Sequence, residues 1–290
     1  MNETVQLGKR EVGKGFPCFF IAEIGINHNG SVDIAKKLID VAMSAGCEAV
    51  KFQKRTVDVV YTQDELAKPR ETPFGTTNGE LKYALEFGDK EYDAIDAYCA
   101  EKNILWTASC WDEQSVDFIS RYDPAFYKIA SASLTDSELL RCHLDKGKPI
   151  LLSTGMSSLE EIDKAVDVLD KEKLVLLHTT STYPVALEEM NLTAIKTLSK
   201  RYDVPVGYSG HEVGIATSIA AANLGACVVE RHITLDRSMW GSDQAASLEP
   251  QGLRRLIRDV RAIETAMGDG EKIVYPSELP IRAKLRRKNS

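Results

Sequence analysis

The sequence predicts a single α/β domain folded as a (β/α)8 TIM barrel, and three observations lead to that prediction. Short apolar segments recur along the chain, and an amphipathic helical pattern follows each of them. The segments are nearly continuous rather than alternating, as expected for parallel strands that are covered on both faces. Eight segments follow one another, and all steps but the second are about 22 to 31 residues, which is the repeat length of such a barrel.

The strands are predicted from the apolar segments, and the helices from the capping residues between them. The clearest helix is 31–45, with Ser31 as its N-cap and Gly46 at its end. Ser158 and Glu161 form the pattern of a capping box. Further helices are expected after Asp112, Asp136, Ser158, Asn191, Glu212 and Glu249. The predicted strands are 19–27, 49–54, 104–111, 126–131, 149–156, 174–183, 205–209 and 227–236.

The second strand–helix step is longer than the others. Residues 55–88 are polar and rich in Thr, Pro and Gly, and so long a βα loop is typical of an active-site cover. An open doubly wound sheet would show the same alternation, but no G-x-G-x-x-G follows the first strand, which argues against its dinucleotide-binding form. We therefore expect a lead-in at 1–16, the catalytic barrel at 17–270 and a tail at 271–290.

Composition narrows the classes of function. The formal net charge of −7 argues against nucleic acid as a partner. No apolar run approaches the roughly 18 residues of a membrane helix, and residues 1–16 carry no signal-peptide pattern. The six cysteines show no CxxC pair, so we expect buried free thiols in a reducing compartment. These features predict a cytoplasmic protein with no membrane partner.

Polar residues gather at the ends of the predicted strands. A barrel of this kind builds its active site at the carboxyl ends of its strands. Residues two apart in a strand point to the same face of the sheet, so in three of the strands we expect a pair of polar side chains on one face. These are Lys51 with Gln53, Ser209 with His211, and Glu230 with His232.

Two lysines, Lys51 and Lys128, lie inside otherwise apolar strands. A charge in such a place is costly unless it meets an anion. Both lysines converge on the barrel mouth among Ser and Thr hydroxyls, which predicts a phosphate or carboxylate pocket. The alternative is that each lysine pairs with a structural carboxylate, such as Glu23 or Glu230.

The histidines differ in what they predict. His211 and His232 end neighbouring strands, where two imidazoles can share one divalent cation in an open, catalytic site. His28 and His178 are as consistent with simple hydrogen bonding as with a functional role. His143 lies in a helical segment and is expected on the surface.

A series of motifs resembles the N-acetylneuraminate (sialic acid) synthase family. They occur in the family's order along nearly the whole chain. The motifs are IAEIGINHNG (21–30), VKFQ (50–53), YKIAS (127–131), LSTGM (152–156), STYP (181–184), GYSGH (207–211), ERH (230–232) and DQAASLEP (243–250).

The resemblance implies an enzyme of carbohydrate biosynthesis, a C–C bond-forming transferase. It would condense phosphoenolpyruvate with an aldehyde sugar, N-acetylmannosamine-like or a modified amino hexose, to give a sialic-acid-like 3-deoxy-2-ketulosonic acid and phosphate. It also implies a divalent metal, Mn or Mg, held by His211 and His232, and a homodimer. Glu23 would act at the reacting centre, and Tyr183 and Asp243 would face the sugar. The phosphoenolpyruvate ligands would be Lys51, Gln53, Ser109, Lys128, Ser131, Ser181 and Ser209.

The sequence departs from the family pattern at three points, of which the first two concern the sugar and the third keeps a hydroxyl donor. The family usually continues into a small antifreeze-like domain that reaches the partner subunit's site, and we expect this chain to lack it. Ser133 stands where the family commonly carries a glutamate that grips sugar hydroxyls, and Ser109 and Ser181 replace Thr and Asn. Met239, Trp240 and the loop 55–88 are candidates to cover the site instead. Two alternatives stay open: a 3-deoxy-ulosonate synthase for a sugar phosphate, using Arg55 and Arg70, or a non-catalytic barrel that binds a sugar acid.

Overall fold

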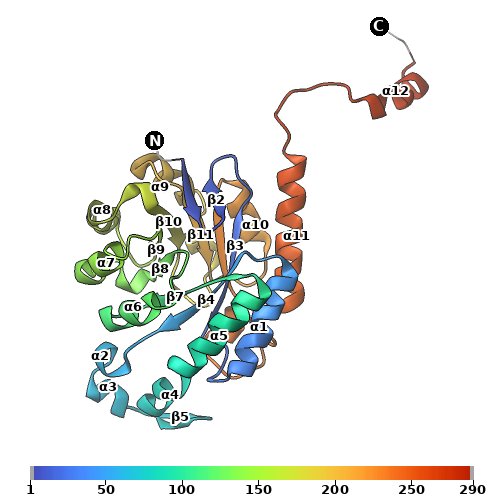
Figure 1. Ribbon diagram of the computed structural model, residues 1–290. Helices are drawn as coiled ribbons and strands as arrows, with labels where there is room; N and C mark the ends of the chain where they lie inside the picture. The colour runs from blue at the N-terminus through green and yellow to red at the C-terminus, as the bar shows by residue number, and fades with distance from the viewer. Residues whose placement is uncertain (1–2, 288–290) are drawn as a thin grey trace.

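A computed structural model describes residues 3–287. Eight parallel strands form a closed barrel in which the last strand pairs with the first, and helices surround it (Figure 1). The barrel strands are β3 (Phe19–Gly25), β4 (Ala49–Lys54), β7 (Leu105–Cys110), β8 (Tyr127–Ile129), β9 (Ile150–Ser153), β10 (Leu174–Thr179), β11 (Val206–Gly210) and β12 (Val228–His232). Each lies within or overlaps its predicted segment, so the predicted fold class is confirmed.

The outer helices begin where the capping residues predict. The side chain of Ser31 accepts a hydrogen bond from the Ile34 backbone, and Gly46 ends that helix with a φ of 95°. Asp112 and Asp136 cap their helices in the same way, and Ser158 forms the predicted capping box with Glu161. The outer helices are α1 (Val32–Ala45), α5 (Asp89–Lys102), α6 (Glu113–Ser120), α7 (Ser137–Leu144), α8 (Leu159–Val168), α9 (Ala194–Tyr202), α10 (Ala216–Asn223) and α11 (Pro250–Ala266).

The predicted loop 55–88 has secondary structure of its own. Its hairpin tip reaches the loop after β12, where the Phe74 and Trp240 rings lie 5.6 Å apart, centroid to centroid, edge to face. The segment therefore joins the loop that carries Trp240, rather than standing free. Its elements are α2 (Val57–Val60), α3 (Gln63–Ala67), β5 (Pro69–Thr72), β6 (Gly75–Thr77) and α4 (Asn78–Leu85).

The amino-terminal segment, expected only as a lead-in, contains an antiparallel hairpin, β1 (Thr4–Leu7) and β2 (Arg10–Gly13). Val5, Leu7 and Val12 are buried in one cluster with inward-facing strand residues such as Phe19 and Ile21. The hairpin therefore closes the amino end of the barrel with apolar side chains.

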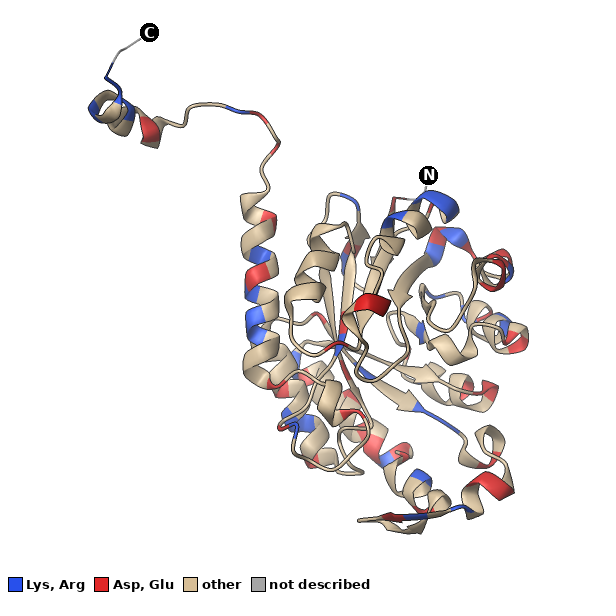
Figure 2. Cartoon of the chain, turned by 180° about the vertical axis from the view of Figure 1, so that it is seen from behind, with Lys and Arg blue, Asp and Glu red and all other residues tan. Residues whose placement is uncertain are grey.

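The carboxyl-terminal segment leaves the barrel after α11 and ends in the short helix α12 (Leu279–Leu285), which lies away from the barrel (Figure 1). Of the predicted lead-in and tail, residues 1–2 and 288–290 lie outside the described part of the chain. Charged residues of both signs are interspersed over the outer helices and loops (Figure 2). Within residues 3–287, every helix is too short or too polar to cross a membrane.

Candidate active site

A cavity of about 230 Å³ opens at the carboxyl ends of the barrel strands. It brings together all the predicted site residues except Ser133 and Asp243. The predicted residues that line it are Glu23, Lys51, Gln53, Ser109, Lys128, Ser131, Ser181, Tyr183, Ser209, His211 and His232.

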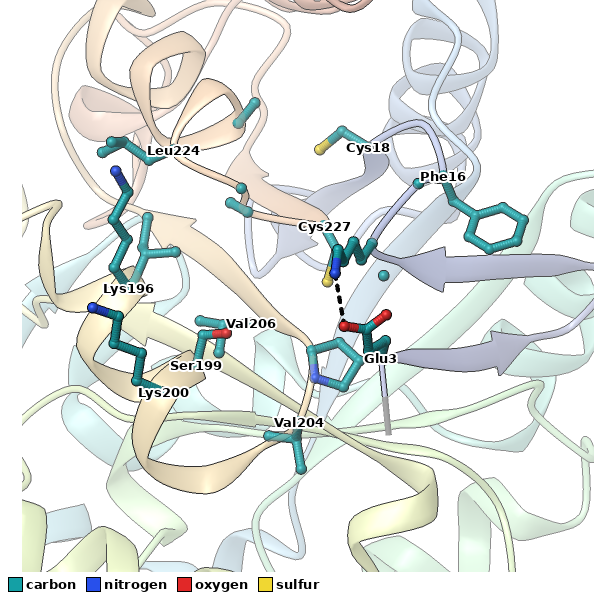
Figure 3. Close-up of a pocket in the computed structure, with 18 of the residues that line it drawn as sticks. Glu3, Phe16, Cys18, Lys196, Ser199, Lys200, Val204, Val206, Leu224 and Cys227 are labelled. Atoms are coloured by element: carbon teal, nitrogen blue, oxygen red, sulfur yellow. Dashed lines mark hydrogen bonds and ion pairs between the residues drawn. The ribbon is translucent and has the colours of Figure 1, made fainter. Parts of the chain in front are cut away.

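A larger cavity, about 730 Å³, lies elsewhere, between the amino-terminal hairpin, α9 and the start of β11 (Figure 3). None of the predicted site residues lines it. Three lysines line it: Lys14 follows the amino-terminal hairpin, and Lys196 and Lys200 belong to the exposed face of α9. The size of a cavity therefore does not identify the site of chemistry in this molecule.

The two predicted lysines meet two carboxylates inside the smaller cavity. Lys51 Nζ lies 2.6 Å from Glu23 Oε2 and 3.8 Å from Glu230 Oε1, and Lys128 Nζ lies 3.3 Å from the same Glu230 oxygen. All four side chains are buried. The ion pairs of the alternative interpretation are thus present, and all four of their side chains line the cavity.

Hydrogen bonds complete this charged layer. Lys51 Nζ donates to Ser109 Oγ at 2.9 Å, and Ser209 Oγ donates to Glu230 Oε1 at 3.1 Å. Gln53 Nε2 donates to Glu23 Oε1 at 3.0 Å. Each charge therefore has a fixed partner before any ligand enters, as buried charges require.

The charged groups differ in the direction of their pKa shifts. Burial raises the pKa of Glu23, and the opposing effect of Lys51 is smaller. For Glu230 burial acts in the same direction, but Lys128 and Lys51 together lower its pKa to about 2. Burial lowers the pKa of Lys128 despite the nearby Glu230. Glu23 is therefore the carboxyl group of this pair that is closer to carrying a proton near neutral pH.

A second wall of the cavity consists of hydroxyl groups around Gly155. The Gly155 backbone N–H donates to Ser131 Oγ at 3.0 Å. A Cβ atom at Gly155 would lie 2.2 Å from Ser181 Oγ and 2.8 Å from Ser131 Oγ, so only glycine fits. Ser153 also lines the cavity, and its buried Oγ has no hydrogen-bond partner among residues 3–287. The sequence places Ser153 at a strand end, but nothing in it distinguishes this serine as a ligand.

His211 and His232 lie side by side at the cavity, with ring centroids 5.5 Å apart. Burial lowers the pKa of His211 to about 3 and that of His232 to about 4, so both imidazoles are neutral at pH 7. His211 Nδ1 donates to the Thr180 carbonyl at 2.8 Å, which leaves its Nε2 with a free lone pair.

The pair fits a divalent cation in its chemistry. His232 Nδ1 is buried without a hydrogen-bond partner in the described part of the chain, and Asp243 Oδ2 lies 3.8 Å from it. Asp243 thus stands beside His232 rather than in the cavity wall. No cluster of three or more metal-ligating side chains occurs among residues 3–287, so water or substrate oxygens would have to complete the coordination.

The remaining histidines are held by ordinary contacts. His28 stacks on Phe87 with centroids 3.9 Å apart, and its Nδ1 accepts a hydrogen bond from the Gly30 backbone. His178 Nε2 donates to the Met190 carbonyl at 2.7 Å.

The prediction that His143 lies on the surface is wrong. It is fully buried, and its Nδ1 donates to the Leu139 carbonyl at 2.8 Å. Four-residue spacing places it on the same inner helix face as Leu139.

Ser133 is buried, but it does not line the cavity. It lies at the end of a 3₁₀ turn, Ser131–Ser133, in which its backbone N–H donates to the Ala130 carbonyl at 3.0 Å. The position where the family pattern places a sugar-gripping glutamate therefore offers no side chain to this cavity.

Comparisons with known proteins identify relatives of this chain. Residues 38–272 match the model of the NeuB family. The chain is 40% identical to human N-acetylneuraminate-9-phosphate synthase over 281 residues, which are 95% of this chain and 78% of that protein. It is 37% identical to N,N'-diacetyllegionaminic acid synthase of Legionella pneumophila over 97% of this chain and 82% of the relative.

The structure resembles that of an N-acetylneuraminic acid (sialic acid) synthetase from Leptospira borgpetersenii, solved with citrate. The TM-score is 0.84 at 32% identity, and the match covers 98% of both chains. The chain therefore belongs to the NeuB family, and it is a sialic acid synthase-like enzyme built on a (β/α)8 barrel.

Proposed function

We propose that this enzyme condenses phosphoenolpyruvate with an aldehyde sugar to give a 3-deoxy-2-ketulosonic acid and inorganic phosphate. One observation carries the proposal. Two buried lysines, a row of serine hydroxyls and two neutral imidazoles converge on a single cavity at the carboxyl ends of the barrel strands. The names of the relatives, which are synthases of sialic and legionaminic acids, support the same class of reaction.

Phosphoenolpyruvate carries a phosphate and a carboxylate, and the cavity offers donors for both. Lys51 and Lys128 supply positive charge, while the hydroxyl groups of Ser131 and Ser181 supply hydrogen bonds. Gln53, Ser109 and Ser209 complete the proposed ligand set. Glu23 and Glu230 hold the lysines in place until the anion arrives, which avoids an unpaired buried charge.

The reaction joins two carbons and releases one phosphate. The methylene carbon of phosphoenolpyruvate attacks the aldehyde carbon, and the aldehyde oxygen takes up a proton. Water adds to the neighbouring carbon, and phosphate leaves from the resulting tetrahedral centre. We assign the proton transfer to Glu23, because its raised pKa and its contacts with Lys51 and Gln53 hold a titratable carboxyl at the cavity.

His211 and His232 would hold a divalent cation, Mn or Mg. When bound, such a cation polarises a carbonyl oxygen as a Lewis acid. Thr180 orients His211 through its carbonyl, and Tyr183 packs on the same ring with centroids 3.9 Å apart. These contacts are made by the chain itself, so its own residues orient the His211 imidazole.

We propose an N-acetylmannosamine-like or modified amino hexose as the acceptor. Ser133 withholds the usual glutamate side chain from the cavity, which favours a modified hexose over N-acetylmannosamine itself. A sugar phosphate is the second candidate. The human relative is named for a 9-phosphate product, and the Arg55 guanidinium lies 4.3 Å from the ring centroid of Trp111, which lines the cavity. We further propose a cytoplasmic homodimer whose catalytic unit is 17–270.

The test is phosphate release from phosphoenolpyruvate by the full-length protein, with Mn, Mg or a chelator. The aldehydes are N-acetylmannosamine, its 6-phosphate and a 2,4-diacetamido hexose. We expect release that requires both an aldehyde and a cation and that is lost in His211→Ala. Absence of release with every aldehyde, from folded protein that binds Mn, would overturn the proposal in favour of a sugar-acid-binding barrel.

A further inference from the structure

A buried ion pair lies directly behind the two active-site histidines. Arg231 precedes His232 in β12, and Glu212 follows His211 after β11. Neighbouring residues of a strand point to opposite faces, so Arg231 lies on the helix side of the barrel wall while His232 faces the cavity. Arg231 is 1% exposed and is among the largest fully buried side chains of the molecule.

Arg231 grips both the side chain and the backbone that follow His211. Its Nη1 lies 2.7 Å from Glu212 Oε1 and donates to the Gly214 carbonyl at 2.9 Å. Its Nη2 donates to the Glu212 carbonyl at 2.6 Å. The guanidinium therefore ties Glu212 and the backbone that follows it to the strand that carries His232.

Glu212 is held from its other side as well. Ser218 Oγ donates to its Oε1 at 2.5 Å, and the Tyr208 hydroxyl donates to its Oε2 at 2.9 Å. Gly210 makes this approach feasible, because a Cβ atom there would lie 2.4 Å from Glu212 Oε2. Both carboxylate oxygens thus have partners, and the carboxylate cannot turn away from Arg231.

We propose that Arg231 and Glu212 are positioning residues that fix the relative placement of His211 and His232. The inference deepens the proposed function, since it concerns the imidazoles assigned there to the cation. An apolar pair would fill the same space at no loss of stability, so stability alone gives no reason for a buried ion pair here. Its forked contacts with the Glu212 and Gly214 carbonyls instead hold the segment that follows His211 against β12, which an apolar pair would not do.

The first test reads the imidazoles directly, in metal-free protein. Side-chain ¹⁵N–¹H spectra of the five histidines are assigned by single His→Gln substitutions. In Arg231→Lys, which keeps the charge but loses the fork, we expect the resonances of His211 and His232 to shift while those of His143 stay in place. Glu212→Gln should give smaller shifts of the same two residues, and it serves if Arg231→Lys does not fold.

The matched control is Arg261→Lys, which weakens an ion pair of 2.9 Å with Glu48 at the other end of the barrel. It should leave the His211 and His232 resonances unchanged. Unshifted resonances of this pair in folded Arg231→Lys and Glu212→Gln would overturn the inference. Equal shifts of His143 would do the same, because they would indicate general loosening.

A second measurement follows the cation without any reaction. Mn²⁺ affinity, measured by electron paramagnetic resonance, should fall about 10- to 100-fold in Arg231→Lys, the usual effect of losing a partner behind a metal ligand. Arg261→Lys should bind Mn²⁺ as the unaltered protein does. If the proposed reaction fails but the imidazole shifts occur, the positioning role stands by itself. Unchanged Mn²⁺ affinity with unshifted imidazoles would refute it.

Discussion

The two ends of the barrel contrast sharply in what they bury. At the amino end, Val5, Leu7 and Val12 of the hairpin enter an apolar interior. At the carboxyl end, the interior holds two lysines, two glutamates and two imidazoles. The amino-end cavity is the larger, about 730 Å³ against about 230 Å³. Buried charge is costly without a purpose, so we take it, rather than cavity volume, as the mark of the proposed active site.

One ion pair from each end shows the same contrast. Lys14 and Glu3 lie 2.8 Å apart with side chains 76% and 48% exposed. Lys51 and Glu23 lie 2.6 Å apart with side chains 4% and 1% exposed. Water screens an exposed pair, which therefore contributes little to stability, whereas removing one partner of a buried pair costs about 3–5 kcal/mol. The two pairs therefore have similar distances but very different effects on stability.

The largest effect is expected for Lys128→Met. Glu230 keeps Lys51 and Ser209 as partners, so the barrel should still fold, but one of two cations facing the anionic substrate is lost. We expect phosphate release to fall about 10²- to 10³-fold or more, as for loss of a preorganised donor. The assay is kcat/KM for phosphoenolpyruvate, with circular dichroism as the check on folding. A rate within about threefold of the unaltered enzyme would contradict the assignment of Lys128.

At the other end, Leu7→Ala should lower stability and spare activity. Leu7 is fully buried among the strand residues of the barrel interior, and truncation leaves a void. The free energy of unfolding should fall by about 2–5 kcal/mol, while kcat per folded molecule is unchanged. Urea unfolding measures the first, and the phosphate assay the second.

The control for this prediction is Gln6→Ala, on the exposed face of the same strand. It should change stability by less than about 0.5 kcal/mol. A large loss of kcat in folded Leu7→Ala would show that the hairpin influences the cavity at the carboxyl ends of the strands. It would contradict the assignment of stability to one end of the barrel and activity to the other.

The same contrast explains what the sequence could predict. The eight strands are evident because burial on both faces makes each an apolar run. The hairpin is missed because only Val5, Leu7 and Val12 stand out in a charged segment, and their burial depends on the barrel they close. His143 is misplaced for a similar reason: four-residue spacing from Leu139 gives its helix face, but only tertiary packing shows that this face is covered.

At the mouth, the lysines and histidines are predictable because charged residues in apolar strands are rare and must have a reason. Their partners are harder to foresee. Ser153 and Ser133 are both serines near strand ends, yet only Ser153 lines the cavity. Ser133 is kept out of the cavity wall by the 3₁₀ turn Ser131–Ser133, and no residue pattern in the sequence predicts this turn.

A smaller effect is expected from pH on the binding of the cation. Imidazoles with ordinary pKa values near 6.5 would protonate between pH 7.5 and pH 6, and two of them would lose roughly tenfold in affinity. Here burial lowers the pKa of His211 to about 3 and that of His232 to about 4, so both remain neutral ligands over this range. Mn²⁺ affinity should therefore change by less than about twofold between these values. A tenfold loss on acidification would show that the pair is more open to water than its burial indicates.

The smallest effect is expected for Lys196→Ala combined with Lys200→Ala, at the larger cavity. Both side chains are exposed on α9, so their charges are solvated without help from the fold, and nothing is left unpaired when they are removed. Stability should stay within about 0.5 kcal/mol, and kcat/KM for phosphoenolpyruvate should be unchanged. Compared with Lys128→Met, the double variant removes more positive charge from a larger cavity. If the double variant lowered kcat/KM by tenfold or more, buried charge would no longer distinguish the active end of the barrel from the other. The amino-end cavity would then contribute to activity as well.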